Sequence, residues 1–259
     1  MFGISTEDYG LILLVLAVVA AIVLLVRSRL DSVLTRDADS VAAVSAAAIA
    51  VYGLILGLTL AAAWERYQRS DETLNAELNE MFVLFRIADN WAGAEGGDLQ
   101  QAVVDYGIAV SDYELTGQSA DQIDNAPARA EITRMYQLMR EITSGPGGSS
   151  NAIQPAWTAL ANLDVARGQR LTLTRQALPD AFWTVLWVGG AISLLLLIVI
   201  HPENRGLHLA ISLVAALLII LTLVLLRELD APLSGTSTID FDSFRSGVAV
   251  LQKSAAAGP

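Results

Sequence analysis

The chain contains no cysteine, so disulfide bonds, thiol catalysis and cysteine-ligated metal sites are excluded. It has a single lysine, Lys253, and a formal net charge of -11. A chain this acidic repels phosphate, which argues against nucleic acid as a partner. Charge is also missing locally, because four long stretches contain no Asp, Glu, Lys or Arg.

Each uncharged stretch is about as long as the roughly 17 to 25 residues that a helix needs to cross the hydrocarbon of a bilayer. The first is preceded by Glu7 and Asp8 and by no basic residue, so it is interpreted as a retained span and not as a signal peptide. We therefore predict an all-α integral membrane protein with four transmembrane helices in two hairpins. The predicted spans are residues 9–26, 40–64, 181–202 and 206–226.

These spans divide the chain into a first transmembrane hairpin (residues 9–64), an extramembrane helical domain (65–180), a second hairpin (181–226) and a C-terminal tail (227–259). The central domain holds nine arginines against seventeen acidic residues, which is typical of a soluble region. We expect a multi-pass protein of a bacterial inner membrane or plasma membrane. The arginines near the span ends leave open which side holds the central domain and the termini.

Apolar residues at steps of three and four predict that the central domain is helical. No Gly or Pro separates the stripe Leu74, Leu78, Met81 and Phe85 from the second span, so one helix is expected from about residue 41 to about residue 91. A Gly-rich break is expected at residues 93–97, a helix capped by Asn125 begins near Pro127, another covers about 155–178, and a last one covers 241–251. A further helix face is marked by Val103, Tyr106, Val110 and Tyr113.

The second span carries two stripes at helical spacing. One consists of small residues, which allow helix backbones to approach closely in a membrane, namely Ala46, Ala50, Gly53, Gly57 and Ala61. The other is narrow and partly polar, and its residues are candidates to line a pore: Ser45, Tyr52, Ile55, Leu56, Thr59 and Ala63. The alternative is that Tyr52 and Thr59 satisfy each other or nearby backbone carbonyls inside a packed bundle.

Arginines at the end of this span have two interpretations. Arg66 and Arg69 could attract ions at a pore mouth, or they could lie among the lipid headgroups beside Trp64 and Tyr67. Trp183 and Trp187 have the same anchoring interpretation. Charges further along could pair across the central domain or form a solvated surface; these are Glu77, Glu80, Arg167, Arg170 and Arg175.

The sequence predicts neither catalysis nor a cofactor. It has no nucleophile–base set and no phosphate-binding glycine loop. His201 and His208, with Glu203 between them, do not match a standard metal-ligand spacing. The spans contain no acidic or basic residue, which disfavours a proton-driven transporter.

Three stretches of the chain together carry a resemblance to a known family. The first runs from Val51-Tyr52-Gly53-Leu54 through Trp64-Glu65-Arg66-Tyr67 to Asn75-Ala76-Glu77-Leu78. The second comprises residues 167–170 and Leu178-Pro179-Asp180-Ala181-Phe182-Trp183, and the third is Leu229-Asp230-Ala231-Pro232-Leu233-Ser234-Gly235. The combination resembles a bacterial family of bestrophin-like membrane proteins, from whose pattern Leu233 departs, because the family usually has Phe there.

Bestrophins are pentameric anion channels, so the resemblance implies a homo-oligomeric, pentameric ion channel in the lipid bilayer that conducts anions such as chloride. The pore would be lined by the second span, and an apolar constriction near Ile55 and Leu56 would close it by dewetting. The acidic central domain would repel anions if it lined the pathway. The alternative is a membrane-anchored interaction or sensory protein that uses its helical domain without conducting ions.

Overall fold

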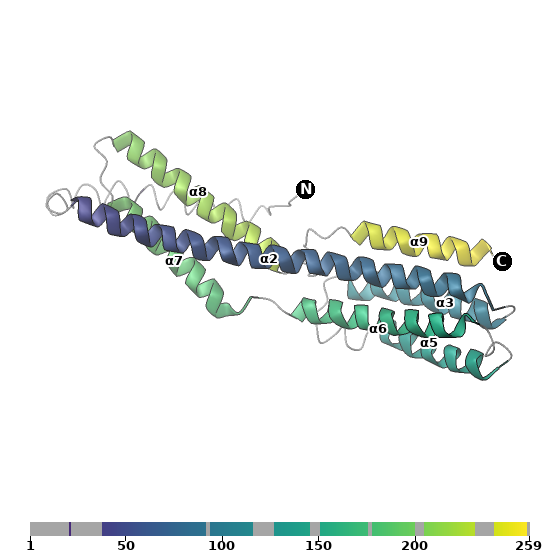
Figure 1. The fold of residues 1–259 in the computed structure, drawn as a ribbon. Coiled ribbons are helices and arrows are strands. Elements are labelled where there is room, and N and C mark those ends of the chain that lie inside the picture. Colours follow the sequence, from purple (N-terminus) through teal and green to yellow (C-terminus); the bar gives the residue numbers. More distant parts are fainter. Residues whose placement is uncertain are drawn as a thin grey trace. The chain divides into compact units, whose positions relative to one another are not determined.

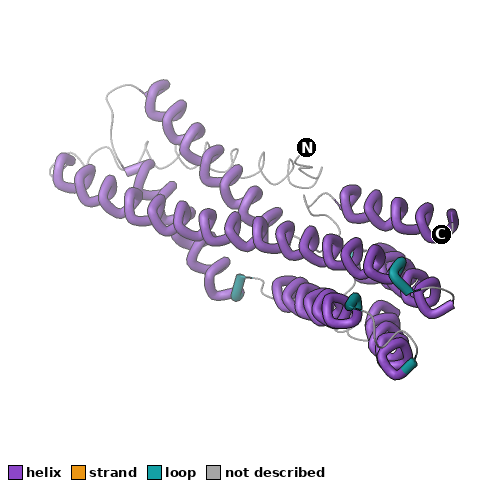
Figure 2. Tube along the Cα trace, turned by 45° about the vertical axis from the view of Figure 1, so that its right-hand side comes forward, coloured by secondary structure: helices purple, strands orange, loops and turns teal. Residues whose placement is uncertain are grey.

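The computed structural model describes residues 21, 38–91, 94–115, 127–145, 151–175, 178–199, 205–230 and 241–257. Within these residues the chain is helical and has no strand, as the sequence predicts (Figures 1 and 2). Contacts divide the chain into two compact units. The first unit comprises Met1–Glu65 and Leu178–Asp230, and the second comprises Arg66–Ala177 and Ala231–Pro259.

The longest element is α2, Ala38–Ala88, a continuous helix of 51 residues. This confirms the long helix predicted from the absence of Gly and Pro after the second span. It ends where the backbone N–H groups of Asn90 and Trp91 donate to the carbonyls of Ile87 and Ala88. Residues up to Glu65 belong to the first unit and the remainder to the second.

The first unit also contains α7, Asp180–Val199, and α8, Arg205–Asp230, which pack against each other. Helix α7 begins directly after Pro179, whose carbonyl accepts the N–H of Phe182. Three of the described helices are long and apolar enough to cross a membrane, with candidate spans Ala42–Ala88, Asp180–Leu197 and Leu209–Asp230. Apart from residue 21, the predicted span at residues 9–26 lies outside the described residues, so the four-span topology stays a prediction.

Large apolar side chains are exposed along α2, α7 and α8, the helices described in the first unit. They include Val51, Leu54 and Leu58 on α2, Val185 and Ile192 on α7, with further examples on α8 at Ile211, Val214 and Leu218. Water-soluble surfaces rarely carry contiguous apolar area on this scale. These faces therefore contact lipid or other protein chains.

In its described residues the second unit consists of the C-terminal part of α2 and five further elements. They are α3 (Ala94–Ala109), the π-helix η2 (Val110–Glu114), α5 (Pro127–Ser144), α6 (Ile153–Arg175) and α9 (Phe241–Ala257). Helix α3 contacts α5 and α9, and α5 contacts α6. Their apolar faces form one core that includes Met81, Leu84, Leu99, Val103, Tyr106, Met135, Met139, Leu160, Leu163, Phe244 and Leu251.

Several predicted boundaries shift in the structure. Helix α3 begins at Ala94, within the Gly-rich segment expected to separate the helices. Helix α5 begins at Pro127, as predicted for a proline in a first turn, whereas Asn125 lies outside the described residues. Helix α6 covers Ile153–Arg175, earlier at both ends than the predicted 155–178, and α9 extends past residue 251 to Ala257.

Close helix contacts in this core depend on two glycines. A Cβ atom at Gly107 of α3 would lie 2.5 Å from Met81 Cε and 2.8 Å from Val248 Cγ2. A Cβ atom at Gly247 of α9 would lie 2.7 Å from Leu78 Cδ2. Real Cβ atoms are not found that close to neighbours, so a larger residue at either position would require the neighbouring side chains to move.

Candidate functional site

Most of the predicted pore-lining residues are turned into the first unit. Of the six candidates, Ile55 is 40% exposed and Thr59 is half-buried. The other four are buried within the subunit, namely Ser45, Tyr52, Leu56 and Ala63. A pore lined by α2 would therefore expose only part of the predicted stripe.

The two hydroxyl groups of this stripe are bonded to backbone carbonyls. Tyr52 Oη donates to the Leu186 carbonyl on α7 at 3.0 Å. The Tyr52 ring occupies the space beside Gly189 and Gly190, where an added Cβ would lie 2.7 Å and 3.0 Å from Tyr52 atoms. Thr59 Oγ1 donates to the carbonyl of Ile55 at 2.8 Å. The packed-bundle interpretation thus describes the contacts of both hydroxyls.

The predicted helix-packing stripe lies on the surface of the first unit. Around Gly53 and Gly57, nothing in the described part of the chain lies within 4 Å of an added Cβ. The whole stripe is exposed: Ala46, Ala50, Gly53, Gly57 and Ala61. Small residues on an exposed membrane helix allow another helix to approach closely. This face is therefore open to lipid or to another chain.

A second polar contact of the first unit joins the ends of α7 and α8. The Asp230 carboxylate, at the end of α8, accepts the backbone N–H of Leu178 at 2.7 Å and Trp183 Nε1–H at 3.2 Å. The sequence suggested an anchoring role for Trp183 and no partner for Asp230. In the structure, two of the three stretches similar to bestrophin-like proteins meet at this carboxylate.

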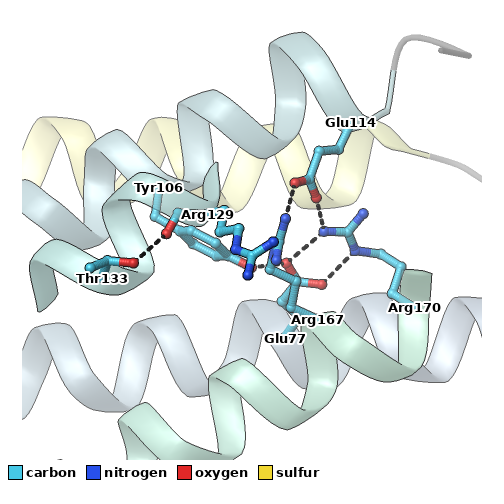
Figure 3. A network of polar contacts seen from close by, with 7 residues as sticks. All are labelled: Glu77, Tyr106, Glu114, Arg129, Thr133, Arg167 and Arg170. Atoms are coloured by element: carbon cyan, nitrogen blue, oxygen red, sulfur yellow. Dashed lines mark hydrogen bonds and ion pairs between the residues drawn. The ribbon is translucent and has the colours of Figure 1, made fainter. Parts of the chain in front are cut away.

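The second unit contains a buried cluster of opposite charges contributed by α2, η2 and α6 (Figure 3). Arg170 is 1% exposed. Its Nε and Nη2 atoms donate to Glu77 Oε2 at 2.6 Å and Oε1 at 3.1 Å. Its Nη2 also donates to Glu114 Oε2, and Arg167 Nη2 donates to Glu114 Oε1 at 2.7 Å.

This cluster balances two carboxylates against two guanidinium groups. Tyr106 of α3 adds a hydrogen bond from its hydroxyl to Glu77 Oε1. Burial raises the pKa of Tyr106 well above its usual value, and the neighbouring Glu77 carboxylate raises it further. Burial alone would lower the pKa of Arg170, but Glu77 and Glu114 outweigh this and raise it. The tyrosine therefore stays neutral and the arginine stays charged.

The structure confirms the pairing predicted for Glu77 with an arginine of α6, namely Arg170, and the solvated-surface alternative is wrong for this pair. Glu80 lies nearer the surface, where it accepts Asn162 Nδ2–H at 3.4 Å. The side chain of Arg175 lies outside the described residues. The pairing was predictable because α2 carries acidic residues, α6 carries arginines, and both helices adjoin predicted spans.

The arginines predicted at the pore mouth belong to the second unit. Arg66 is half-buried and Arg69 is exposed. Arg69 borders a groove of about 630 Å³ between α2 and α6. The groove is also lined by Glu72, Thr73, Val165, Gly168, Gln169, Thr172 and Leu173.

The histidine pair cannot be placed. His201 and the side chain of His208 lie outside the described residues. Within the part that is described, no group of three or more His, Asp or Glu side chains could hold a metal ion.

Sequence reasoning missed Glu114. The helical pattern placed Tyr113 on the buried face, but Tyr113 is 46% exposed and Glu114 is 2% exposed. The π-turn at η2 turns Tyr113 outward, whereas Glu114, four residues after the buried Val110, lies on the buried face. Tyr106 was correctly placed on the buried face, but its bond to Glu77 was not foreseen.

These features define a class: a helical membrane protein whose described residues form an apolar unit of α2, α7 and α8 and a second helical unit held by a buried charge cluster. A family model for the bestrophin-like domain matches residues 12–244, so the chain belongs to the bestrophin-like family. No curated protein matches it in sequence.

The fold is similar to that of a bacterial bestrophin homologue from Klebsiella pneumoniae. One such structure gives a TM-score of 0.75 at 13% identity and covers 94% of this chain and 95% of that chain. A point mutant of the homologue gives 0.76 at 13% identity, covering 95% and 98%. A crystal structure described only as a membrane protein variant gives 0.76 at 14% identity, covering 98% of each chain. At these identities the likeness shows the fold.

Proposed function

We propose that this protein is an oligomeric ion channel of the bestrophin type, whose pore is surrounded by the α2 helices of several copies. Membership in the bestrophin-like family, with a fold likeness over nearly the whole chain, carries the proposal. The first unit adds support, because its α2 face of small residues is exposed and can accept a neighbouring helix. By the same kinship, five copies form the ring and the ion is an anion such as chloride.

Ile55 and Thr59 are the proposed lining residues, because they belong to the predicted stripe and reach the subunit surface. Ile55 would provide the apolar constriction that closes by dewetting. The four buried members of the stripe would support this wall from within the subunit. Tyr52 would do so through its bond to α7.

Charge decides selectivity in this proposal. Arg66 and Arg69 would attract anions, whereas the seventeen acidic residues between 65 and 180 would repel them. An anion pathway therefore requires the acidic surface to face away from it. Parallel flux measurements with chloride and potassium distinguish an anion-selective channel from a cation-selective one.

The first test is the subunit count of the detergent-purified protein by native mass spectrometry, followed by ion flux in liposomes. We expect Thr59→Trp to abolish flux while the oligomer still assembles, because the indole would fill the pore. Leu58→Trp is the matched control: Leu58 is 63% exposed and points about 100° away around the helix. Normal ion flux through assembled Thr59→Trp would reject Thr59 as a lining residue. Loss of flux in Leu58→Trp would show that the side of α2 bearing Leu58 lines the pore.

A membrane-anchored interaction or sensory protein is the second candidate. The observation that favours it is the groove of about 630 Å³ between α2 and α6, which combines charged, polar and apolar lining residues. In that case the first unit holds the second unit at the bilayer. A monomer or dimer that persists in lipid nanodiscs and passes no ions would favour this candidate.

A further inference from the structure

The groove of about 630 Å³ lies within the second unit, between residues 69–73 of α2 and residues 165–173 of α6. Sites for small organic ligands usually have volumes of about 300–1,000 Å³. Gly168 leaves the middle of the α6 wall without a side chain, and nothing in the described part of the chain lies within 4 Å of an added Cβ there. The groove is therefore large enough for a small organic molecule.

Two apolar side chains of α6 line the groove. Val165 is 58% exposed and Leu173 is half-buried. Both contribute to the same wall, with Gly168 between them. A ligand with an apolar body would remove this apolar area from water, which favours its binding.

The threonine hydroxyls of the groove offer acceptors and no donors. Thr73 Oγ1 donates to the carbonyl of Arg69 at 2.7 Å. Thr172 Oγ1 donates to the carbonyl of Gly168 at 2.8 Å. Because a hydroxyl has a single hydrogen, each oxygen has only its lone pairs left for a ligand. The hydroxyls therefore favour a ligand that donates hydrogen bonds.

The charges around the groove favour a cation. Glu72 lines it with an exposed side chain, and no hydrogen bond or ion pair of its carboxylate is found within the described residues. The segment from 65 to 180 adds the field of seventeen acidic residues against nine arginines. Arg69 is the one cation among the residues that line the groove, and it already takes part in another interaction.

We propose that this groove binds a small organic ammonium ion that has an apolar body. The ammonium group donates to the Glu72 carboxylate and to the threonine oxygens, while the apolar body contacts Val165 and Leu173. Arg69 opposes the charge of the ligand and limits its affinity. The proposal names a ligand for the groove that favours the second candidate function, and it holds whether or not the protein conducts ions.

Isothermal titration calorimetry of the full-length, detergent-purified protein tests the ligand class. The probe is isopentylammonium chloride, and protein-free micelles provide the blank. Isopentanol, isohexanoate and leucine have a similar apolar body and are neutral, anionic and zwitterionic. We expect a dissociation constant of about 1 mM for the ammonium and binding at least about tenfold weaker for the other three. Absence of ammonium binding, or equally tight binding of any of the other three, would overturn the proposal.

Two substitutions on α2 test the charges. Glu72→Gln removes the anion, keeps the shape, and should weaken isopentylammonium binding by about tenfold. Arg69→Gln removes the opposing cation and should tighten binding by about threefold. Glu141→Gln is the control, because Glu141 is exposed on α5 and does not line the groove. Unchanged binding in Glu72→Gln, or weaker binding in Arg69→Gln, would contradict an ammonium site.

A substitution on α6 tests the location. Gly168→Leu places a side chain in the groove without a clash, so it should abolish binding and leave the protein folded, since Leu favours a helix more than Gly does. Gly97→Leu is the matched control: Gly97 is exposed on α3, has equally open space and does not line the groove. Melting curves establish that both variants are folded. Retained binding in folded Gly168→Leu would reject the groove as the site.

Discussion

Replacing Arg170 with Met should destabilise the second unit by about 3–5 kcal/mol, the usual cost of removing one partner from a buried ion pair. Arg170 is 1% exposed and donates to both Glu77 and Glu114. Methionine fills a similar volume, so the cost arises from two buried carboxylates that lose their shared cation. Glu77 would retain the Tyr106 hydroxyl, and Glu114 would retain Arg167.

Hydrogen exchange followed by mass spectrometry measures this cost within each unit of the intact protein. Amides of α3 and α6 should lose protection in Arg170→Met, because local opening of the second unit becomes easier. Arg140→Met is the control, since Arg140 is exposed on α5 and its replacement should change stability by less than about 0.5 kcal/mol. A decrease below about 1 kcal/mol in the stability of the second unit in Arg170→Met would refute the conclusion that the charge cluster stabilises this unit.

A second substitution distinguishes an unpaired charge from lost packing. Glu77→Met combined with Arg170→Met removes both partners of the two-atom contact, so the double variant should be more stable than Arg170→Met alone. The two residues lie in direct contact, so their effects should be strongly non-additive. If the stability loss of the double variant equalled the sum of the losses in the two single variants, the two charges would not stabilise each other.

Two further predictions address the Tyr52 contact and the cluster tyrosine. Gly189→Ala should lower the melting temperature, because its Cβ would lie 2.7 Å from the Tyr52 ring, whereas Gly53→Ala has open space and should be tolerated. Tyr106 has a raised pKa, while an unfolded tyrosine ionises near pH 10. The contribution of Tyr106 to the free energy of unfolding is therefore complete below pH 10. It is lost as the pH rises above 10, at up to about 1.4 kcal/mol per pH unit. Tyr106→Phe should remove this alkaline loss in melting curves recorded from pH 9 to 11.

The helices could be predicted from sequence because their signals are local. Long uncharged runs and the absence of Gly and Pro after residue 57 in α2 required no knowledge of tertiary contacts. The faces of α2 were harder to assign. Both of its stripes consist of residues that fit a helix interface, and only the contact of Tyr52 with α7 shows which stripe packs inside the subunit.

The rest could not be predicted because it depends on partners distant in the chain. Glu114 lies in the core, and the arginines that bind its carboxylate lie 53 and 56 residues away along the chain. Asp230 likewise finds its partners Leu178 and Trp183 at 52 and 47 residues' distance. A local pattern contains no information about either contact.

The residues that carry the family resemblance also hold each unit together. Tyr52 donates to Leu186 at a separation of 134 residues, Asp230 joins the ends of α7 and α8, and Glu77 pairs with Arg170 at a separation of 93. Tyr52 and Glu77 are buried within their own units, so these motif side chains do not reach an exposed face. Sites of conduction should therefore be sought on the exposed faces of α2, where Thr59→Trp and Leu58→Trp probe adjacent directions around one helix.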